Sequence, residues 1–290
     1  MDEAQQDYFL AEWLLDGYVD GKGKAEYGWA LSAVQKIFPR LRLKVAWRVF
    51  DAWGQLHPPT QAPAVPPEVI HGMIAIALSL NRPALAGMMV ACYAGLLRAR
   101  EALNLLRRDV LIQSDGIVLC LGRTKQGTEQ RVILRNATVI HFLQCYSNGC
   151  PRMADEPFFP LSYSSALRWV KKLSQLLDCM GAPVTTHTFR RSGASELARL
   201  GTPLADILLF GRWNTQRSAR EYIRKGEVAI YRARQSMQIA TQQRVETWAR
   251  LSNRSWQLFD RLHQQGQPVV CLRRVTKEAF AEFEKLIFQL

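Results

Sequence analysis

The sequence lacks the long apolar segment that a membrane protein or a secreted precursor would carry. Its longest uncharged apolar run, residues 83–97, is 15 residues long, whereas a helix that spans a membrane needs about 20. The N-terminus has no basic segment ahead of an apolar stretch, which a secretory signal would show. We therefore expect an intracellular protein without membrane contact, in which residues 83–97 form a core helix.

The sequence also lacks the common motifs of metal and cofactor chemistry. It has no GxxxxGK[ST] phosphate loop, no GxSxG elbow, no HExxH pair and no cluster of acids that would hold two magnesium ions. The six cysteines are scattered without a CxxC pair or the Cys/His spacing of a zinc site, so we expect reduced core thiols. No metal and no cofactor is expected, and phosphate chemistry in this chain would proceed without metal.

Acidic residues are few relative to basic ones. The 25 Asp and Glu face 38 Lys and Arg, which leaves a formal charge of +13. Residues 1–66, 67–235 and 236–290 carry −1, +11 and +3 respectively, so the excess lies in the middle of the chain. A polyanion is the simplest partner for such a charge, and acidic lipid is the alternative.

A proline-rich segment divides the chain. Residues 57–67 contain five prolines in eleven residues, which cannot support a helix or a central strand. We predict a linker at 58–67. The apolar spacing at 5–16 and 25–55 before it predicts a short helical domain at 1–57.

The sequence after the linker predicts helices with one small sheet. β-branched runs at 116–121 and 130–134, separated by a turn at 122–128, predict a hairpin. The fold class is therefore mainly α with a small β-hairpin or sheet (α+β), comprising a domain at 68–235 and a helical extension at 236–290 whose residues 251–290 have no assigned role. Helices are predicted at 68–80, 84–106, 136–146, 164–180, 188–200, 203–209, 226–250 and 277–290.

Two short motifs place arginine beside a second functional group. Arg98 interrupts an apolar helix with Glu101 one turn later, so the acid can orient the guanidinium. His187 and Arg190 share one face at the start of a helix. Each motif alone is weak, because a solvated arginine and a chance HxxR pattern are common.

Further along, Gly211-Arg212-Trp213 precedes Tyr222 by nine residues counted from the tryptophan. In order and spacing, these pieces resemble the tyrosine recombinase (phage integrase) family over residues 68–235. The resemblance implies a catalytic domain of that fold. It assigns catalytic roles to Arg98, Lys125, His187, Arg190, Trp213 and Tyr222, with Glu101 as the supporting acid.

The resemblance implies a site-specific recombinase or integrase, as found in mobile elements. Two arginines would clamp the scissile phosphate of double-stranded DNA, Tyr222 would attack phosphorus, and Lys125 would protonate the leaving 5′-oxygen. The product would be a 3′-phosphotyrosyl intermediate. The implied partners are DNA and further copies of the chain, assembled on DNA as a tetrameric synapse, in the nucleus of a eukaryote or the cytoplasm and nucleoid of a prokaryote.

Three arginines and the N-terminal part extend or depart from the family pattern. The family's additional DNA-binding domain usually has roughly a hundred residues, whereas only 57 precede the linker here. Arg191 stands where a histidine is frequent, and Arg212 stands where a small or neutral residue is usual. We expect both, and Arg123 on the hairpin turn, to contact DNA phosphates.

Two other functions remain open at the level of sequence. The first is a DNA-binding protein that derives from a recombinase and no longer cuts DNA. The second is an enzyme like the type IB topoisomerases. The helix after the nucleophile carries an apolar stripe at 228–251. It either folds back on its own domain or docks on a neighbouring subunit, and the family resemblance favours the subunit contact in a protein that is monomeric until it meets DNA.

Overall fold

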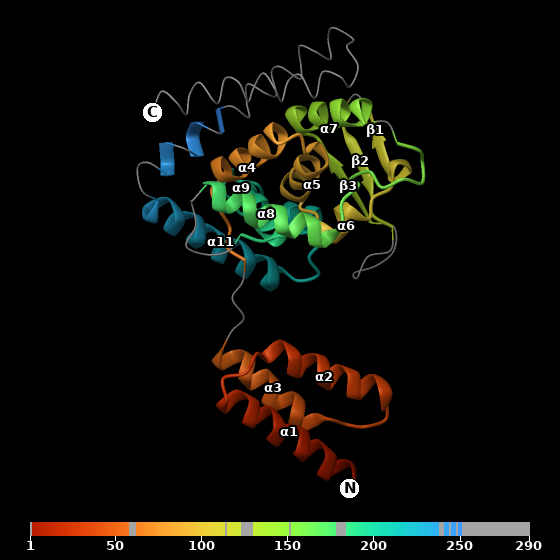
Figure 1. Cartoon of the computed structure of the whole chain (residues 1–290), viewed down its shortest axis with the longest axis vertical. Helices are drawn as coiled ribbons and strands as arrows, with labels where there is room; N and C mark the ends of the chain where they lie inside the picture. Colours follow the sequence, from red (N-terminus) through yellow and green to blue (C-terminus); the bar gives the residue numbers. More distant parts are fainter. Residues whose placement is uncertain are drawn as a thin grey trace. The chain divides into compact units, whose positions relative to one another are not determined.

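The chain forms two compact units, Met1–Gln61 and Ala62–Leu290, whose boundary falls in the proline-rich segment (Figure 1). The computed structural model describes residues 2–57, 62–113, 115–122, 130–150, 152–177, 184–237, 241–243, 245–247 and 249–250. None of the described helices is both long and apolar enough to cross a membrane.

The first unit consists of three helices, α1 (Glu3–Val19), α2 (Lys24–Ile37) and α3 (Lys44–Leu56). The helical pattern at 25–55 is therefore two helices, because the chain turns at Phe38–Leu43, where Pro39 removes a backbone donor. The buried Asp7 of α1 accepts hydrogen bonds from the backbone N–H groups of Val45 and Ala46, at 2.9 Å each, and so caps α3.

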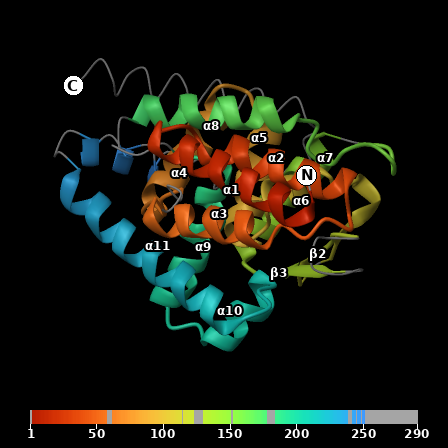
Figure 2. The same ribbon diagram turned by 90° about the horizontal axis from the view of Figure 1, so that it is seen from below.

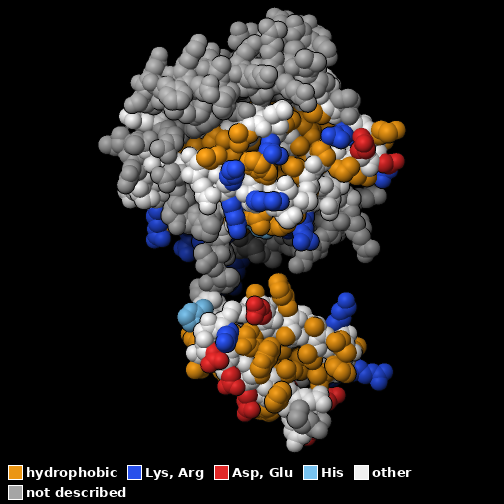
Figure 3. All heavy atoms as spheres, viewed as in Figure 1, with side chains coloured by type: hydrophobic (Ala, Val, Ile, Leu, Met, Phe, Trp, Pro, Cys, Tyr) orange, Lys and Arg blue, Asp and Glu red, His pale blue; other side chains and the backbone are white. Residues whose placement is uncertain are grey.

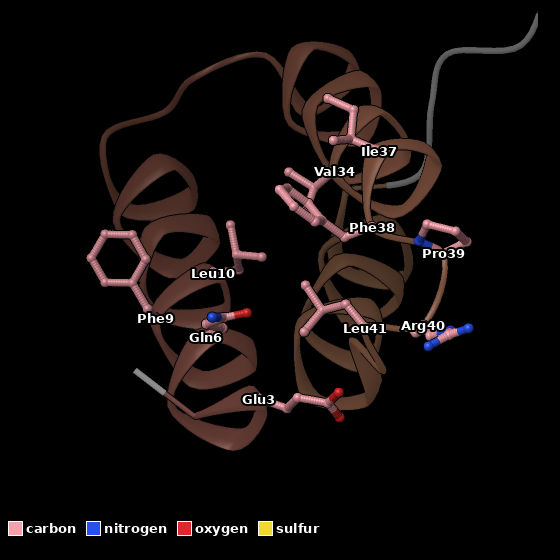
Figure 4. A pocket seen from close by; sticks show the side chains of 10 residues that line it. All are labelled: Glu3, Gln6, Phe9, Leu10, Val34, Ile37, Phe38, Pro39, Arg40 and Leu41. Atoms are coloured by element: carbon pink, nitrogen blue, oxygen red, sulfur yellow. The ribbon is translucent and has the colours of Figure 1, made fainter.

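Apolar side chains remain exposed on the first unit, as the orange surface in Figure 3 shows. Figure 4 shows a pocket of about 700 Å³ between α1 and the end of α2. Its lining is mainly apolar and includes Phe9, Leu10, Val34 and Phe38, together with the charged Glu3 and Arg40.

The second unit is helical around one small sheet, which confirms the predicted fold class. Strands β1 (Val110–Ile112), β2 (Ile117–Cys120) and β3 (Arg131–Leu134) form an antiparallel sheet in the order β1-β2-β3, with Ile117 opposite Leu134. The predicted hairpin is β2–β3, and β1 is an additional strand. The helices are α4 (Pro67–Ser79), α5 (Pro83–Ala94), α6 (Ala99–Leu103), α7 (Ala137–Gly149), α8 (Tyr163–Leu177), α9 (Thr186–Arg199), α10 (Leu204–Gly211) and α11 (Gln216–Ser236), with a 3-10 turn at Arg107–Asp109.

Helix α5 is the centre of this unit. It contains no charged residue, its residues 85–92 are buried, and it packs against α4, α7 and α9. Its apolar sequence is therefore explained by burial on all sides, as expected for a core helix. The cysteines described in the second unit, Cys92, Cys120, Cys145 and Cys150, are free thiols.

The predicted helix at 84–106 is interrupted. Its first part, α5, ends at Ala94, and α6 begins after Arg98, whose backbone is extended (φ −72°, ψ 146°). Between them Leu96 adopts φ +47°, which is uncommon for a residue with a side chain. The prediction of one continuous helix was wrong because the local apolar pattern does not reveal this left-handed residue.

Helix α11 begins ten residues before the predicted start, so it contains Tyr222. Figure 2 shows this helix beside α9 and α10. The apolar stripe that follows packs within its own unit. Ile230 is buried, Val245 belongs to the main core of the second unit, and Met237 packs against that core. The described part of the stripe therefore packs on its own unit, and the expected contact of this segment with a neighbouring subunit stays a prediction. Residues 251–290, with the predicted helix 277–290, lie outside the described residues.

Candidate active site

The interruption between α5 and α6 presents Arg98. As the residue before α6, Arg98 has its backbone N–H bonded to Glu101 Oε2 at 2.8 Å, while its guanidinium contacts Glu101 Oε1 at 2.5 Å. One carboxylate thus fixes both the backbone and the side chain of Arg98. The Arg98 side chain is 30% exposed, so part of it remains accessible.

Arg212 joins the same carboxylate from α10. Its guanidinium lies 2.6 Å from Glu101 Oε2 and its side chain is 7% exposed. Arg212 adopts φ +56°, the left-handed conformation that ends α10. Burial raises the pKa of Glu101, but the charges of Arg212 and Arg98 and the hydrogen bonds from Arg98 outweigh it and lower this pKa overall.

Arg212 thus forms an ion pair inside the protein, and the expected contact of its guanidinium with a DNA phosphate stays a prediction. Arg191, the second arginine outside the family pattern, is also buried. Arg123 and Lys125 lie outside the described residues.

Arg190 occupies the centre of the site from α9. Its guanidinium donates to the carbonyl of Leu96 at 2.6 Å and to the carbonyl of Gly211 at 2.5 Å, and lies 3.9 Å from Glu101. Burial, together with the charge of Arg98, lowers the pKa of Arg190 to about 10. Arg190 therefore ties the α5–α6 interruption to the end of α10.

Helix α9 begins with a capping box formed by Thr185 and Thr188. Thr185 Oγ1 accepts from the His187 backbone N–H at 3.3 Å, and the Thr188 hydroxyl accepts from the Thr185 N–H at 3.1 Å. This cap places the exposed His187 one turn before Arg190. Partial burial lowers the pKa of His187, and the positive charge of Arg190 lowers it further.

Tyr222 faces α9 and the end of α10. Its ring centroid lies 5.3 Å from that of Trp213, and the guanidinium carbon of Arg191 lies 4.5 Å from the centre of its ring. Trp213 in turn packs on Gly211, where a Cβ would overlap the indole. Burial raises the pKa of Tyr222, while Arg190 and Arg191 act to lower it.

The structure thus brings together eight of the predicted residues, from helices α6, α9 and α11 and from the turns before α6 and after α10. Their arginines outnumber the carboxylate four to one, which suits an anion with several oxygens. Within the described ranges, no three His, Cys, Asp or Glu side chains gather as a metal site. These eight residues are Arg98, Glu101, His187, Arg190, Arg191, Arg212, Trp213 and Tyr222.

Sequence reasoning missed the main-chain parts of the site. The carbonyls of Leu96 and Gly211 hold Arg190, but a carbonyl carries no residue-specific signal. The contact of Arg191 with Tyr222 was also missed, because the two residues are 31 positions apart and only the packing of α9 on α11 joins them.

Comparison with known proteins identifies the family of the chain. The model of the phage integrase family matches residues 67–227, a range that contains every residue of the site. The chain belongs to the phage integrase family. The resemblance noted in the sequence is therefore confirmed for the family.

Solved structures of this family share the fold at low identity. The XerH site-specific recombinase bound to difH substrate is 16% identical, with a TM-score of 0.55 over 77% of this chain and 67% of that one. The Tn1549 transposon integrase in complex with transposon right end DNA is 15% identical, with a TM-score of 0.51 over 74% and 80%. No curated protein matches the sequence.

Proposed function

We propose that this member of the phage integrase family is a site-specific DNA recombinase that cuts and rejoins strands through a 3′-phosphotyrosyl intermediate. The observation that carries the proposal is the position of Tyr222 beside the paired Arg190 and Arg191, with Trp213 against its ring. The relatives XerH and Tn1549 integrase, which are bound to DNA in their structures, support double-stranded DNA as the partner.

Arg98 and Arg190 bind the scissile phosphate in this proposal. A guanidinium has five N–H donors, and the two carbonyl bonds of Arg190 leave three for an anion. Arg98 offers donors of its partly exposed side chain from a position fixed by Glu101. Two planar forks on the non-bridging oxygens neutralise the charge that grows as the pentavalent state forms.

The transfer step needs a base and an acid. Tyr222 Oη forms a bond to phosphorus as the bond from phosphorus to the 5′-oxygen breaks, and the phenolic proton passes to His187, whose low pKa keeps it neutral. Trp213 donates its indole N–H to a phosphate oxygen, and Lys125 supplies the proton for the leaving 5′-oxygen. Four copies assembled on two duplexes complete the exchange.

The first prediction concerns the nucleophile. A radiolabelled duplex, enriched from random sequence by binding to the full chain, is expected to form a covalent adduct that survives a denaturing gel. Tyr222→Phe removes one oxygen and no charge, so it should abolish the adduct and keep DNA binding. The matched control is Tyr231→Phe, an exposed tyrosine of the same helix, which should leave the adduct unchanged.

Three outcomes contradict this proposal. Persistence of the adduct in Tyr222→Phe moves the nucleophile to another residue. Binding without any adduct in the unaltered chain makes it a DNA-binding protein that does not cut. Relaxation of a supercoiled plasmid without recombinant product points instead to topoisomerase activity with the same chemistry.

A further inference from the structure

The end of the proline-rich segment, residues 62–65, is docked on α9. The backbone N–H of Val65 donates to Ser192 Oγ at 2.9 Å, and the carbonyl of Ala62 accepts from the Arg191 guanidinium at 2.6 Å. Two consecutive α9 side chains therefore hold the chain just after the boundary between the units.

The same segment also lies against α11. The side chain of Ala64 is fully buried, and a Cβ on Gly226 would lie 3.4 Å from it and would overlap the Ser195 hydroxyl. Gly226 follows Tyr222 by four residues, so the two share one face of α11. The absence of a side chain at Gly226 thus allows α9, α11 and the docked segment to approach closely.

Arg191 connects the docked segment to the nucleophile. Its guanidinium carbon lies 4.5 Å from the centre of the Tyr222 ring, within the range of a cation–π interaction, and a side-chain hydrogen bond from Arg191 reaches the phenol. The preceding residue, Arg190, instead bonds to Leu96 and Gly211. Neighbouring arginines of one helix therefore serve different parts of the site.

The different contacts of Arg190 and Arg191 have a consequence once a phosphate is bound. Phosphate oxygens would neutralise Arg98 and Arg190, which then no longer favour the charged phenolate. Arg191 has no outward route to that phosphate, since it is 7% exposed and bonded to Ala62. It remains as a cation at the phenol, where it both limits ring motion and favours the phenolate.

We propose that Arg191 is a positioning residue for Tyr222, and that the docked segment 62–65 sets its position through the carbonyl of Ala62. The inference rests on the proposed function for the role of Tyr222. It adds a connection between the end of the interdomain linker and the nucleophile, made by an arginine where the family frequently has histidine.

The test compares three variants of the full chain at saturating concentrations of the enriched duplex. Arg191→Met should slow adduct formation by about tenfold to a hundredfold, because the nucleophile loses its alignment. It should leave DNA affinity and its salt dependence unchanged. Arg191→Lys keeps the positive charge, so adduct formation should depend on pH as it does in the wild type. It should recover only part of the wild-type rate. Arg199→Met, which removes an exposed arginine from the same helix, should retain the wild-type rate.

The result that overturns the proposal is a wild-type rate in Arg191→Met, or a rate loss that comes entirely from weaker DNA binding with a smaller salt slope. Thermal unfolding of each variant identifies any loss of fold. If Arg191→Met unfolds, Arg191→Lys carries the same comparison, because a lysine cannot reach Ala62 and Tyr222 at once with a planar fork.

A double-mutant cycle tests the role of the docked segment. Ser192→Ala removes the hydrogen bond to Val65 and leaves Arg191 in place. If the segment acts through Arg191, Ser192→Ala should slow adduct formation in the wild-type background and have no further effect in Arg191→Met. Rate losses that simply multiply would show that the segment and Arg191 act independently, which contradicts the proposal.

A measurement without DNA separates this proposal from the proposed function. With 3-fluorotyrosine placed at position 222 alone, fluorine NMR reports the ionisation of the phenol in the full chain. Arg191→Met should raise its apparent pKa by about one unit, while Arg199→Met should not. An unchanged titration overturns the proposal. If the unaltered chain forms no adduct with any duplex, the recombinase activity is wrong while the titration still decides the role of Arg191.

Discussion

Glu101 holds Arg98 and Arg212 by short contacts and lies within 4 Å of Arg190. One negative charge among guanidiniums reduces their mutual repulsion in a partly dehydrated site. It also fixes their directions, because each arginine approaches from a different helix end or turn. The acid is therefore needed for the stability of the site as well as for its geometry.

The second prediction follows from this arrangement. Glu101→Gln keeps the shape of the side chain but leaves the buried Arg212 without its counter-charge, so unfolding free energy should fall by about 3 kcal/mol. Denaturant unfolding of the full chain measures this. The control Glu246→Gln removes an acid from an exposed pair with Arg250 and should cost less than about 1 kcal/mol.

The stabilisation that Glu101 provides should also depend on pH, in a direction that its pKa sets. The folded-state pKa of Glu101 is lowered, so its stabilisation is complete above the ordinary value of 4.5 and is lost as pH falls through the lower folded value. The difference in stability between wild type and Glu101→Gln should therefore shrink below pH 4.5. A difference that stays constant down to the acid transition would contradict the role of the charge.

The third prediction concerns His187. Burial and the charges of Arg190 and Arg98 lower its pKa below 6.5, so the imidazole is neutral and able to accept a proton at neutral pH. Adduct formation measured against pH should have its acid limb below pH 6.5, and His187→Gln should remove that limb. An acid limb above pH 6.5 would assign the proton transfer to another group.

At the scale of elements, apolar periodicity predicts most of the helices of the second unit, because their buried faces repeat with the helical period. It does not predict the turn at residues 95–98. Leu96 and Arg212 adopt left-handed backbone conformations that leucine and arginine rarely take. Arg190 bonds to the Leu96 carbonyl, and Arg212 is held by the backbone bonds that end α10 and by its pair with Glu101.

The order of residues along the chain predicts which residues form the site, but it does not predict how their side chains are oriented. Arg98, Arg190 and Tyr222 follow from their order along the chain. The inward orientation of Arg212 does not, because a basic residue in a DNA-binding family is expected to face phosphate. The strand β1 was missed for a simpler reason, since three residues give too short a pattern.

The fourth prediction concerns the contact between α9 and the end of α5. A Cβ on Gly193 would overlap the carbonyl of Tyr93 and press on the side chain of Leu96, so this glycine sets the distance between the two helices. Gly193→Ala should destabilise the full chain by about 2 kcal/mol, although alanine favours helix, and should slow adduct formation by displacing Arg190.

The control for this prediction is Gly54→Ala in α3. Its Cβ would meet only the end of the flexible Lys24 side chain, which can move away. Helix propensity should then dominate and stabilise the first unit by up to about 1 kcal/mol. Denaturant unfolding compares the two variants, and a neutral or stabilising Gly193→Ala would show that α9 and α5 can separate without cost.

At the scale of the whole molecule, the positive charge divides into a buried and an exposed part. Arg190, Arg191 and Arg212 are enclosed in the site. Helix α8 instead carries exposed Arg168, Lys171 and Lys172 and no acid. Figure 3 shows blue side chains on the described face of the second unit where α8 lies in Figure 1. Only exposed charges of this kind can release counterions from DNA on first contact.

The last prediction uses this division. Affinity for duplex DNA should fall linearly with salt concentration on logarithmic axes, with a slope of about −0.9 for each phosphate neutralised. Lys171→Gln should make the slope less steep by about one contact and weaken binding equally for all sequences. Arg191→Met should leave the slope unchanged, because its guanidinium is bonded within the protein. Equal slopes in wild type and Lys171→Gln would remove α8 from the DNA surface. A smaller slope in Arg191→Met would mean that DNA binding opens the contact with Ala62 and turns this arginine outward.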